Sequence, residues 1–275
     1  MVEFLTEVVK FIIYCSAIVL ISKYILAGTI RKLANSLNLT SKTVGGIAGY
    51  ATSVPELLTV AASSINGLMG ASMYNILSSN IINFLQYTAS IIINKNQKTL
   101  TNKVIKIDIL LVIATILIPI IFIRLNLEMN IITVIIFLLL YLFFKYLDSN
   151  AHKLYLNSQK TEDINKQIKW WDSIKYILVL IISSILLFVV GNLLGETLEN
   201  LCYVFNISES IIGIFLGVIT SIPELITFFE AQRHHNKSNN ELEGVIEATN
   251  NLFTSNILNL FIIQSIGVLL CAIFA

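Results

Sequence analysis

Long apolar runs separated by short polar stretches make up most of this 275-residue chain. Eight of the runs are long enough to cross an apolar layer of roughly 30 Å as helices. They lie at about 8–29, 44–65, 68–93, 106–123, 129–146, 174–195, 211–230 and 245–274. The pattern predicts an all-α integral membrane protein with about eight transmembrane helices.

The composition supports this prediction. Hydrophobic residues make up 56% of the chain and charged residues 13%, whereas soluble domains carry about 25% charged residues. The chain therefore has little room for a soluble domain. The lipid bilayer is its expected partner, and no nucleic acid is expected as a partner.

The distribution of basic residues predicts how the helices are oriented. When the eight spans are numbered, Lys10 and Arg124 fall on one side of the membrane and Lys23 falls within the first span. The other 15 of the 18 lysines and arginines fall on the opposite side. Because basic residues concentrate in cytoplasmic loops, that side is expected to be the cytoplasm. The N-terminus would then lie outside, and the expected location is the plasma membrane.

The sequence contains one motif twice. Residues 52–57 read TSVPEL and residues 220–225 read TSIPEL, at an offset of 168 that also aligns two pairs of glycines. A second block recurs at an offset of 176, with Ser79, Asn80, Ile81 and Asn83 matching Ser255, Asn256, Ile257 and Asn259. The eight extra residues are expected in a polar loop around 232–240, where His234 and His235 are read as solvated. One long period of this kind indicates duplication of a multi-helix unit.

The two copies are predicted to run in opposite directions across the membrane. They lie on the second and seventh spans, and an odd number of steps between two spans reverses the chain direction. Inverted repeats with broken helices near the midplane are typical of secondary transporters. The predicted organisation is a first repeat of five helices at 1–147, a cytoplasmic linker at 148–172 and a second repeat of three helices at 173–275.

Each motif places a carboxylate directly after a proline within an apolar span. A charged group there is costly and is therefore a candidate functional residue. Pro55 lacks an amide hydrogen and its ring clashes with the carbonyl four residues earlier, so we expect the Ala51 carbonyl to lose its helical partner. Pro223 has the same effect on Ile219. Carbonyl, carboxylate and hydroxyl oxygens are the ligands that hard cations such as Ca²⁺ require.

The second block adds a polar stripe, because its residues recur every four positions on a helix. The stripe consists of Asn75, Ser79 and Asn83 in the first repeat and of Asn251, Ser255 and Asn259 in the second. Such stripes also serve as contacts between helices, and proline kinks are common in membrane helices. Both features in both repeats, in the same order, favour one cation site with two carboxylates, Glu56 and Glu224.

On these paired motifs the chain resembles the cation/calcium antiporter superfamily, and within it the sodium/calcium exchanger branch. The resemblance covers roughly 33–86 and 201–264. The proton-coupled branch usually carries a Gly-Asn-x-x-Glu motif, which is absent here. The resemblance implies an antiporter that exchanges Ca²⁺ for Na⁺ by alternating access, in which the first span of each repeat slides across the core.

The resemblance also implies a set of ion ligands. For Ca²⁺ they are the glutamates and the backbone oxygens of the motif threonines, and for Na⁺ they include serines and nearby carbonyls. The implied ligands are Glu56, Glu224, Thr52, Thr220, Ser53, Ser221, Ser79, Ser255, Asn83, Asn259 and the carbonyls near Gly49 and Gly217. Relatives often carry aspartate where this chain has Asn259, which leaves two carboxylates here. No catalytic residue and no cofactor are implied, since Ca²⁺ and Na⁺ are the transported substrates.

The chain departs from the family in length. Family members usually have ten helices, and the last two have no counterpart among the eight spans. A truncated chain, a compact variant or a homo-oligomer that supplies the missing helices in trans would each account for this. A proton-coupled Ca²⁺ antiporter and a non-transporting cation-binding membrane protein remain alternative functions. An enzyme is not expected, because the chain has no phosphate-binding glycine loop and no nucleophile triad.

Overall fold

The computed structural model describes residues 2–21, 24–25, 28–37, 39–125, 127–158, 170–205 and 208–274. These residues contain helices and no strand. The helices are α1 (Val2–Ile21), α2 (Gly28–Ser36), α3 (Ser41–Thr52), α4 (Val54–Ile65), α5 (Met69–Ile93), η2 (Gln97–Thr101), α6 (Lys103–Arg124), α7 (Ile131–Ser158), α8 (Trp170–Phe205), α9 (Glu209–Thr220), α10 (Ile222–Asn236), α11 (Glu241–Ile257), η3 (Leu258–Ile263) and α12 (Gln264–Phe274). The predicted all-α class is confirmed.

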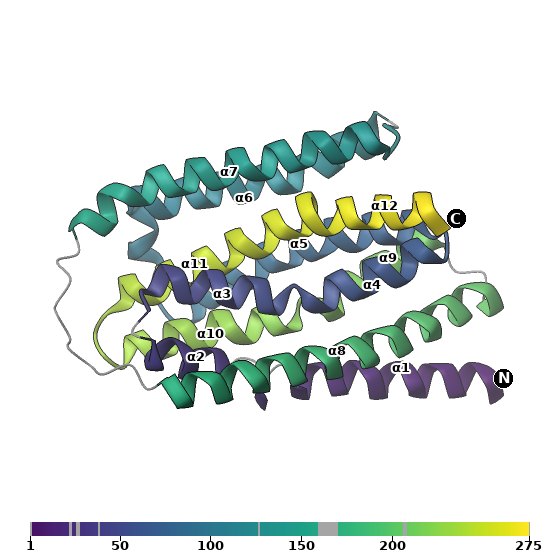
Figure 1. Ribbon diagram of the computed structural model, residues 1–275, viewed down its shortest axis with the longest axis horizontal. Helices are drawn as coiled ribbons and strands as arrows, with labels where there is room; N and C mark the ends of the chain where they lie inside the picture. The colour runs from purple at the N-terminus through teal and green to yellow at the C-terminus, as the bar shows by residue number, and fades with distance from the viewer. Residues whose placement is uncertain are drawn as a thin grey trace.

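The helices form three layers (Figure 1). The pair α6 and α7 lies on one side and the pair α1 and α8 on the other, while α3–α4, α5, α9–α10 and α11–α12 lie between them. In this middle layer α3–α4 and α9–α10 run in opposite directions, as the inverted repeat predicts. The first and last described residues lie at the same end of the molecule, opposite the end of α7 and the start of α8.

Six helical stretches among the described residues are long and apolar enough to cross a membrane. They are Met69–Ile93, Lys103–Arg124, Ile131–Lys153, Ile174–Thr197, Glu209–Asn236 and Glu241–Phe274. Helix α1 and the α3–α4 pair run alongside them (Figure 1), so the arrangement agrees with the expected count of about eight. The protein is an integral membrane protein with six membrane-length helical stretches in its described part.

Each proline motif breaks a helix at the serine. Helix α3 ends at Thr52 and α4 begins at Val54, with Pro55 in the first turn of α4. Helix α9 ends at Thr220 and α10 begins at Ile222 in the same way. Proline suits the first turn of a helix because its missing amide would have no partner there. The predicted disturbance around each motif threonine is therefore present in both repeats.

The glycines that repeat four residues apart let helices of opposite repeats touch backbone to backbone. A Cβ atom built at Gly49 would lie 2.8 Å from the Asn251 carbonyl oxygen of α11, and one at Gly45 would overlap the Glu247 carbonyl. On the other side, Gly213 and Gly217 of α9 face α5 with equally little space. Small residues at this spacing let the backbones of two helices approach closely, and here they do so between the repeats.

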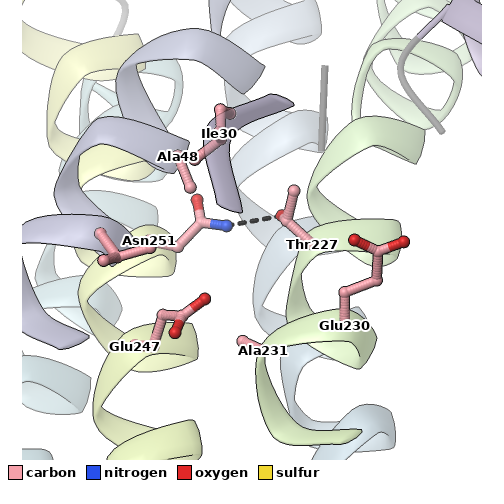
Figure 2. Close-up of a pocket in the computed structure, with 8 residues that line it drawn as sticks. Ile30, Ala48, Thr227, Glu230, Ala231, Glu247 and Asn251 are labelled. Carbon is pink, nitrogen blue, oxygen red and sulfur yellow. Dashed lines mark hydrogen bonds between the residues drawn. The ribbon is translucent and has the colours of Figure 1, made fainter. Parts of the chain in front are cut away.

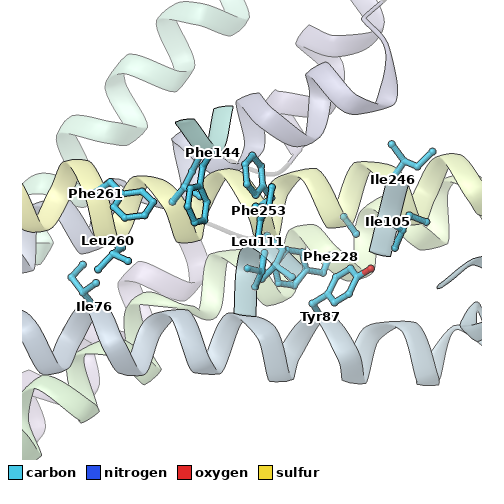
Figure 3. Packing of buried hydrophobic residues seen from close by; sticks show 14 of the residues in the cluster. Ile76, Tyr87, Ile105, Leu111, Phe144, Phe228, Ile246, Phe253, Leu260 and Phe261 are labelled. Carbon is cyan, nitrogen blue, oxygen red and sulfur yellow. The ribbon is translucent and has the colours of Figure 1, made fainter. Parts of the chain in front are cut away.

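Apolar side chains fill the remaining contacts in two clusters. One cluster, shown in Figure 3, joins the middle layer to α6 and α7 and includes Phe144 and Phe261, whose ring centroids are 5.1 Å apart. In the same cluster the rings of Tyr87 and Phe228 meet edge to face at 6.0 Å. The second cluster joins α1 and α8 to α3 and α9. The two outer layers thus each have their own apolar contact with the middle layer.

A buried group of charged side chains ties α3, α6 and α7 together. Lys42 of α3 donates to Asp148 of α7 at 2.9 Å, and His152 lies 3.0 Å from the same carboxylate. The other ring nitrogen of His152 lies 3.5 Å from Asp108 of α6. Residues 148–172 were predicted to be a cytoplasmic linker, and within this range α7 continues through Ser158 and buries Asp148 and His152. Residues 159–169 lie outside the described part of the chain.

The eight extra residues of the second repeat were predicted to lie in a polar loop around 232–240, and they mainly lengthen helices instead. Helix α10 has 15 residues where its counterpart α4 has 12. Helix α11 begins at Glu241, one turn earlier than the offset from α5 requires. The extra turn of α10 carries His235, whose ring nitrogen lies 3.0 Å from the Glu247 carboxylate. Polar residues at the end of a membrane helix remain compatible with helix, so composition alone did not reveal the extension.

We expect Gly213→Ala to destabilise the protein by about 1–3 kcal/mol, since an added methyl group in a packed contact forces the neighbours apart. The new Cβ atom would overlap the Ala71 carbonyl and lie 2.7 Å from Tyr74 Cβ. Thermal unfolding of the detergent-purified protein measures the effect. Gly28→Ala is the matched control because nothing lies within 4 Å of its added atom. Equal melting temperatures for both variants would contradict the packing role of Gly213.

Candidate ion-binding site

The two helix breaks place the motif glutamates at the start of helices in the middle of the molecule. Glu56 lies in the first turn of α4 and Glu224 in the first turn of α10. Both side chains are 0% exposed. The start of a helix carries a partial positive charge that stabilises a nearby carboxylate. Each break therefore provides a partial compensation for the carboxylate that follows it.

Two serines of the polar stripes bridge the repeats. Ser79 of α5 donates to Glu56 Oε1 at 2.8 Å and lies 3.0 Å from the Ser221 hydroxyl of the opposite motif. Ser255 of α11 donates to Glu224 Oε1 at 3.0 Å and accepts from Ser53 Oγ at 3.0 Å. Each stripe serine thus contacts the glutamate of its own repeat and the serine of the other. The four serines predicted as site residues are brought together.

The motif threonines also lie across from the opposite glutamate. Thr220 lies beside Glu56, and Thr52 lies beside Glu224. The Thr220 hydroxyl donates to the Leu216 carbonyl at 3.0 Å, the i−4 bond that an interior threonine makes in a helix. The carbonyl of the preceding residue, Ile219, lies four residues before Pro223, which has no amide to donate to it.

The glycine carbonyls of the two repeats differ in their partners. The Gly49 carbonyl accepts from the Ser53 amide at 3.2 Å, and the Ser53 hydroxyl oxygen lies 2.9 Å from the same carbonyl. The Gly217 carbonyl accepts from the Ser221 amide at 3.2 Å, while the Ser221 hydroxyl turns toward Ser79. Both carbonyls lie in the last turn before the helix break.

Among the buried oxygens that lack a hydrogen-bond partner in the described residues, four belong to the two glutamates and to the last asparagine of each polar stripe. They are Oε2 of Glu56 and Glu224 and Oδ1 of Asn83 and Asn259. All four side chains are buried, and buried polar atoms without a partner are rare in folded proteins. Two carboxylate oxygens and two amide oxygens form a donor set suited to a hard cation.

The asparagines of the second block are held by bonds between the repeats. Asn83 donates to the Ser255 hydroxyl at 3.3 Å, and Asn259 donates to Asn80 Oδ1 at 3.3 Å. Their amide nitrogens are thereby fixed, which leaves their oxygens oriented away from these partners. Asn259 lies in η3, a π-helical turn, and such turns are frequent at functional sites.

Two asparagines that the sequence reading left without a role join the repeats directly. Asn80 donates to the Asn256 backbone carbonyl at 3.2 Å, and Asn256 donates to the Asn80 carbonyl at 3.1 Å. Their equivalent places in the repeat make the pair reciprocal. The recurrence of Asn80 as Asn256 was visible in the sequence, but their contact was not.

A second pair of contacts was missed. Asn75 donates to Thr59 at 2.8 Å and Asn251 donates to Thr227 at 2.6 Å. Each bond joins the helix that follows the break to the stripe helix of the same repeat, one turn beyond the glutamate. The threonines occupy matching places, three residues after each glutamate, which was a signal that the sequence reading did not use.

The site is electrostatically incomplete without a cation. Two carboxylates in a medium of low dielectric carry a large desolvation cost unless they are paired. Hydroxyl donors and helix ends supply partial charges, whereas a bound cation supplies whole ones. The other group of acidic and histidine side chains in the described residues is Asp108, Asp148 and His152, in which Asp148 pairs with Lys42.

The fold and the site together define an inverted-repeat membrane transporter for ions. A family model described as sodium/calcium exchanger protein matches residues 7–148 and 175–274. The chain therefore belongs to the sodium/calcium exchanger family, as its paired motifs indicated. No curated protein matches the chain in a sequence search.

Solved structures show the same fold. The sodium-calcium exchanger NCX_Mj soaked with 2.5 mM Na⁺ and 10 mM Sr²⁺ is 22% identical, with a TM-score of 0.55. The similarity covers 97% of this chain and 83% of that one. The same protein soaked with 2.5 mM Na⁺ and 0.1 mM Ca²⁺ is 21% identical over 96% of this chain and 82% of that one, with a TM-score of 0.54.

We expect Asn80→Ala to destabilise the protein by about 1–3 kcal/mol, because it leaves the buried Asn259 amide without its acceptor. The Asn256 carbonyl also loses its donor. Thermal unfolding in detergent checks the prediction. Asn66→Ala is a suitable control, since the Asn66 side chain bonds only locally to Ala62 and is exposed. A melting temperature equal to the wild-type value would rule out a structural role for the Asn80 side chain in the contact with Asn256 and Asn259.

Proposed function

We propose that this chain is a secondary antiporter that exchanges Ca²⁺ for Na⁺ at a site between the two helix breaks. We call this site the cage, and it is centred on Glu56, Glu224, Asn83 and Asn259. The observation that carries the proposal is the set of four partnerless buried oxygens of Glu56, Glu224, Asn83 and Asn259. Family membership supports the reaction, and the oxygen-only donor set supports the ion class.

We assign the ligands by oxygen type. The two carboxylates and the threonine carbonyls are the proposed Ca²⁺ ligands, and the hydroxyls, amide oxygens and glycine carbonyls complete the Na⁺ sites. The full proposed set is Glu56, Glu224, Thr52, Thr220, Ser53, Ser221, Ser79, Ser255, Asn83, Asn259, Gly49 and Gly217. The serine bridges support this assignment because one hydroxyl reaches both repeats.

Exchange follows from the charge balance of the site. Two carboxylates are neutralised equally by one Ca²⁺ or by two Na⁺, whereas the ion-free site retains two buried charges. The transporter therefore changes between its two access states more easily with ions bound than without them. This difference couples the movement of one ion to the return of the other.

Alternating access requires a surface along which helices slide. Helix α8 packs against α4 through small residues: a Cβ atom built at Gly191 would lie 3.4 Å from Leu58, and one at Gly195 would lie 3.2 Å from Ala62. Helix α1 lies beside α8 on the outer layer (Figure 1). We propose that α1 and α8 move together across the middle layer and expose the cage to each side in turn.

The proposed orientation follows the basic residues. The membrane face that holds the end of α7 and the starts of α8 and α11, here called the linker face, would be cytoplasmic in the plasma membrane. The N-terminus would then lie outside.

We predict that Glu56→Gln and Glu224→Gln each reduce Na⁺-driven Ca²⁺ uptake to the level of empty vesicles, because each removes half of the site charge. Purified protein in lipid vesicles with a Na⁺ gradient measures the flux. Both variants should elute as wild-type protein from a size-exclusion column, because the replacement keeps the side-chain shape.

The matched control is His234→Ala, which lies at the end of α10 outside the cage and should leave the flux unchanged. Wild-type exchange by both glutamine variants would refute the two-carboxylate site. A wild-type protein that moves Ca²⁺ with a proton gradient and not with a Na⁺ gradient would refute the proposed coupling ion.

We also predict electroneutral exchange, two Na⁺ for one Ca²⁺, since both ion loads neutralise the two carboxylates. Ca²⁺ uptake by wild-type protein should not change when a K⁺ diffusion potential is imposed. Asn259→Asp adds a third carboxylate, which three Na⁺ neutralise and one Ca²⁺ does not. Exchange of three Na⁺ for one Ca²⁺ moves net charge, so the flux of this variant should become sensitive to voltage. Voltage-dependent exchange by the wild-type protein would contradict the charge balance.

A further inference from the structure

A small hollow lies between the cage and the linker face. It is lined from α2 and α3 by Ile30, Val44 and Ala48, from α10 by Thr227, Glu230 and Ala231, and from α11 by Glu247 and Asn251 (Figure 2). Its free space is about that of a single water molecule. The hollow therefore has room for one small ion or water.

Two of the lining residues, Asn251 and Thr227, are joined by a hydrogen bond that lies one turn beyond Glu224. Thr227 lies one turn after Glu224 on α10, and Glu230 lies about one turn further toward the linker face. On α11 Glu247 lies one turn nearer that face than Asn251. An ion that moves from the linker face to Glu224 would pass Glu247 first and the Asn251–Thr227 bond second.

Four of the residues that line the hollow, Thr227, Glu230, Glu247 and Asn251, carry side-chain oxygen atoms. Asn251 is 2% exposed, and its Oδ1 atom has no hydrogen-bond partner while its nitrogen donates to Thr227. Figure 2 shows the amide oxygen on the side of Asn251 that faces Ala48. Glu247 is 6% exposed and is held by His235, and Glu230 lines the hollow from a partly exposed position. Amide and carboxylate oxygens again match a hard cation.

The repeat shows that packing does not require these acids. The same threonine–asparagine bond occurs in the first repeat, between Thr59 and Asn75. The offsets of the repeat, however, align Glu230 with Ala62 and Glu247 with Ala71. The two repeats thus share this helix contact, but the second repeat carries two carboxylates there and the first repeat carries two alanine methyl groups.

The opposite end also has a carboxylate nearby, but its role differs. Glu209 accepts from the Ala71 amide at 3.2 Å and so caps the start of α5. This carboxylate oxygen therefore already accepts a backbone amide at the start of a helix, where a negative charge is stabilised. The carboxylate of Glu247 instead lies against His235, which comes from the extra turn of α10.

We propose that Glu230, Glu247 and Asn251 form an entry subsite for the transported cation on the linker face, one helical turn from the cage. Charged groups of one sign at a narrow mouth raise the local concentration of counter-ions. Ca²⁺ or Na⁺ held there passes to Glu224 when the Asn251–Thr227 bond opens. The inference rests on the proposed exchange for its physiological use, but binding at the subsite is measurable without transport.

The first experiment measures Ca²⁺ transport separately from each face of oriented proteoliposomes. Glu247→Gln and Glu230→Gln should each raise the apparent KM for Ca²⁺ at the linker face about threefold to tenfold. The maximal rate and the KM at the opposite face should stay at wild-type values. Glu241→Gln is the matched control, because Glu241 lies on the same helix as Glu247 and at the same linker face of the membrane. Glu241 is exposed and does not line the hollow.

An unchanged KM at the linker face, or an equal rise at both faces, would overturn the proposal. Glu230→Gln keeps the test decisive if loss of the His235 contact prevents Glu247→Gln from folding. The absence of any wild-type flux would refute the proposed exchange alone.

The second experiment measures equilibrium binding of ⁴⁵Ca²⁺ to purified Glu224→Gln protein, in which the cage is disabled. Weak binding that persists in this variant and disappears when Glu247→Gln is added would support the subsite. Binding that is equal with and without Glu247→Gln, or absent from both, would overturn it independently of transport.

Discussion

The burial of two carboxylates in an apolar core is the constraint on which the middle of this molecule depends. The idealised cost of moving one such charge out of water is on the order of 20 kcal/mol. Each glutamate is placed at the start of a helix and receives a serine hydroxyl. These neutral dipoles lower the cost without removing it, and each carboxylate keeps one oxygen without a partner. A bound cation is the remaining source of compensation, so ion binding and core stability are linked.

That compensation requires the repeats to lie very close together. Ser79 reaches the opposite motif only because α5 packs against the glycine face of α9, and Ser255 does so because α11 packs against α3. The inverted repeat makes one contact geometry serve twice. The helix breaks, the glycines and the bridging serines are therefore parts of one arrangement, and a larger residue at the glycine faces would separate the hydroxyls from both glutamates.

Local features of the sequence predicted which side chains meet at the two helix breaks, because these residues belong to short repeated motifs. Proline fixes the helix break and places the following glutamate in a first turn, and spacing by four aligns the stripe serines. The contacts between motifs needed the structure. His152 and Asp108 lie on different helices outside both motifs, so no repeat marked their burial. The extra turn of α10 was missed because its polar residues are compatible with both loop and helix.

The difference between the two membrane faces of the transporter, with Glu230 and Glu247 on one face only, can change ion loading but not the exchange itself. A symmetric cage would load from both faces alike, whereas acids at Glu230 and Glu247 on one side change only the ion concentration at which that face loads. They cannot alter the ratio of ions exchanged, which the charge of the cage sets, nor the direction of net transport, which the gradients set. A ligand shifts an equilibrium only through a difference in affinity between states. The inserted turn that brings His235 to Glu247 therefore adjusts one face of the carrier while the duplicated core continues to determine the exchange itself.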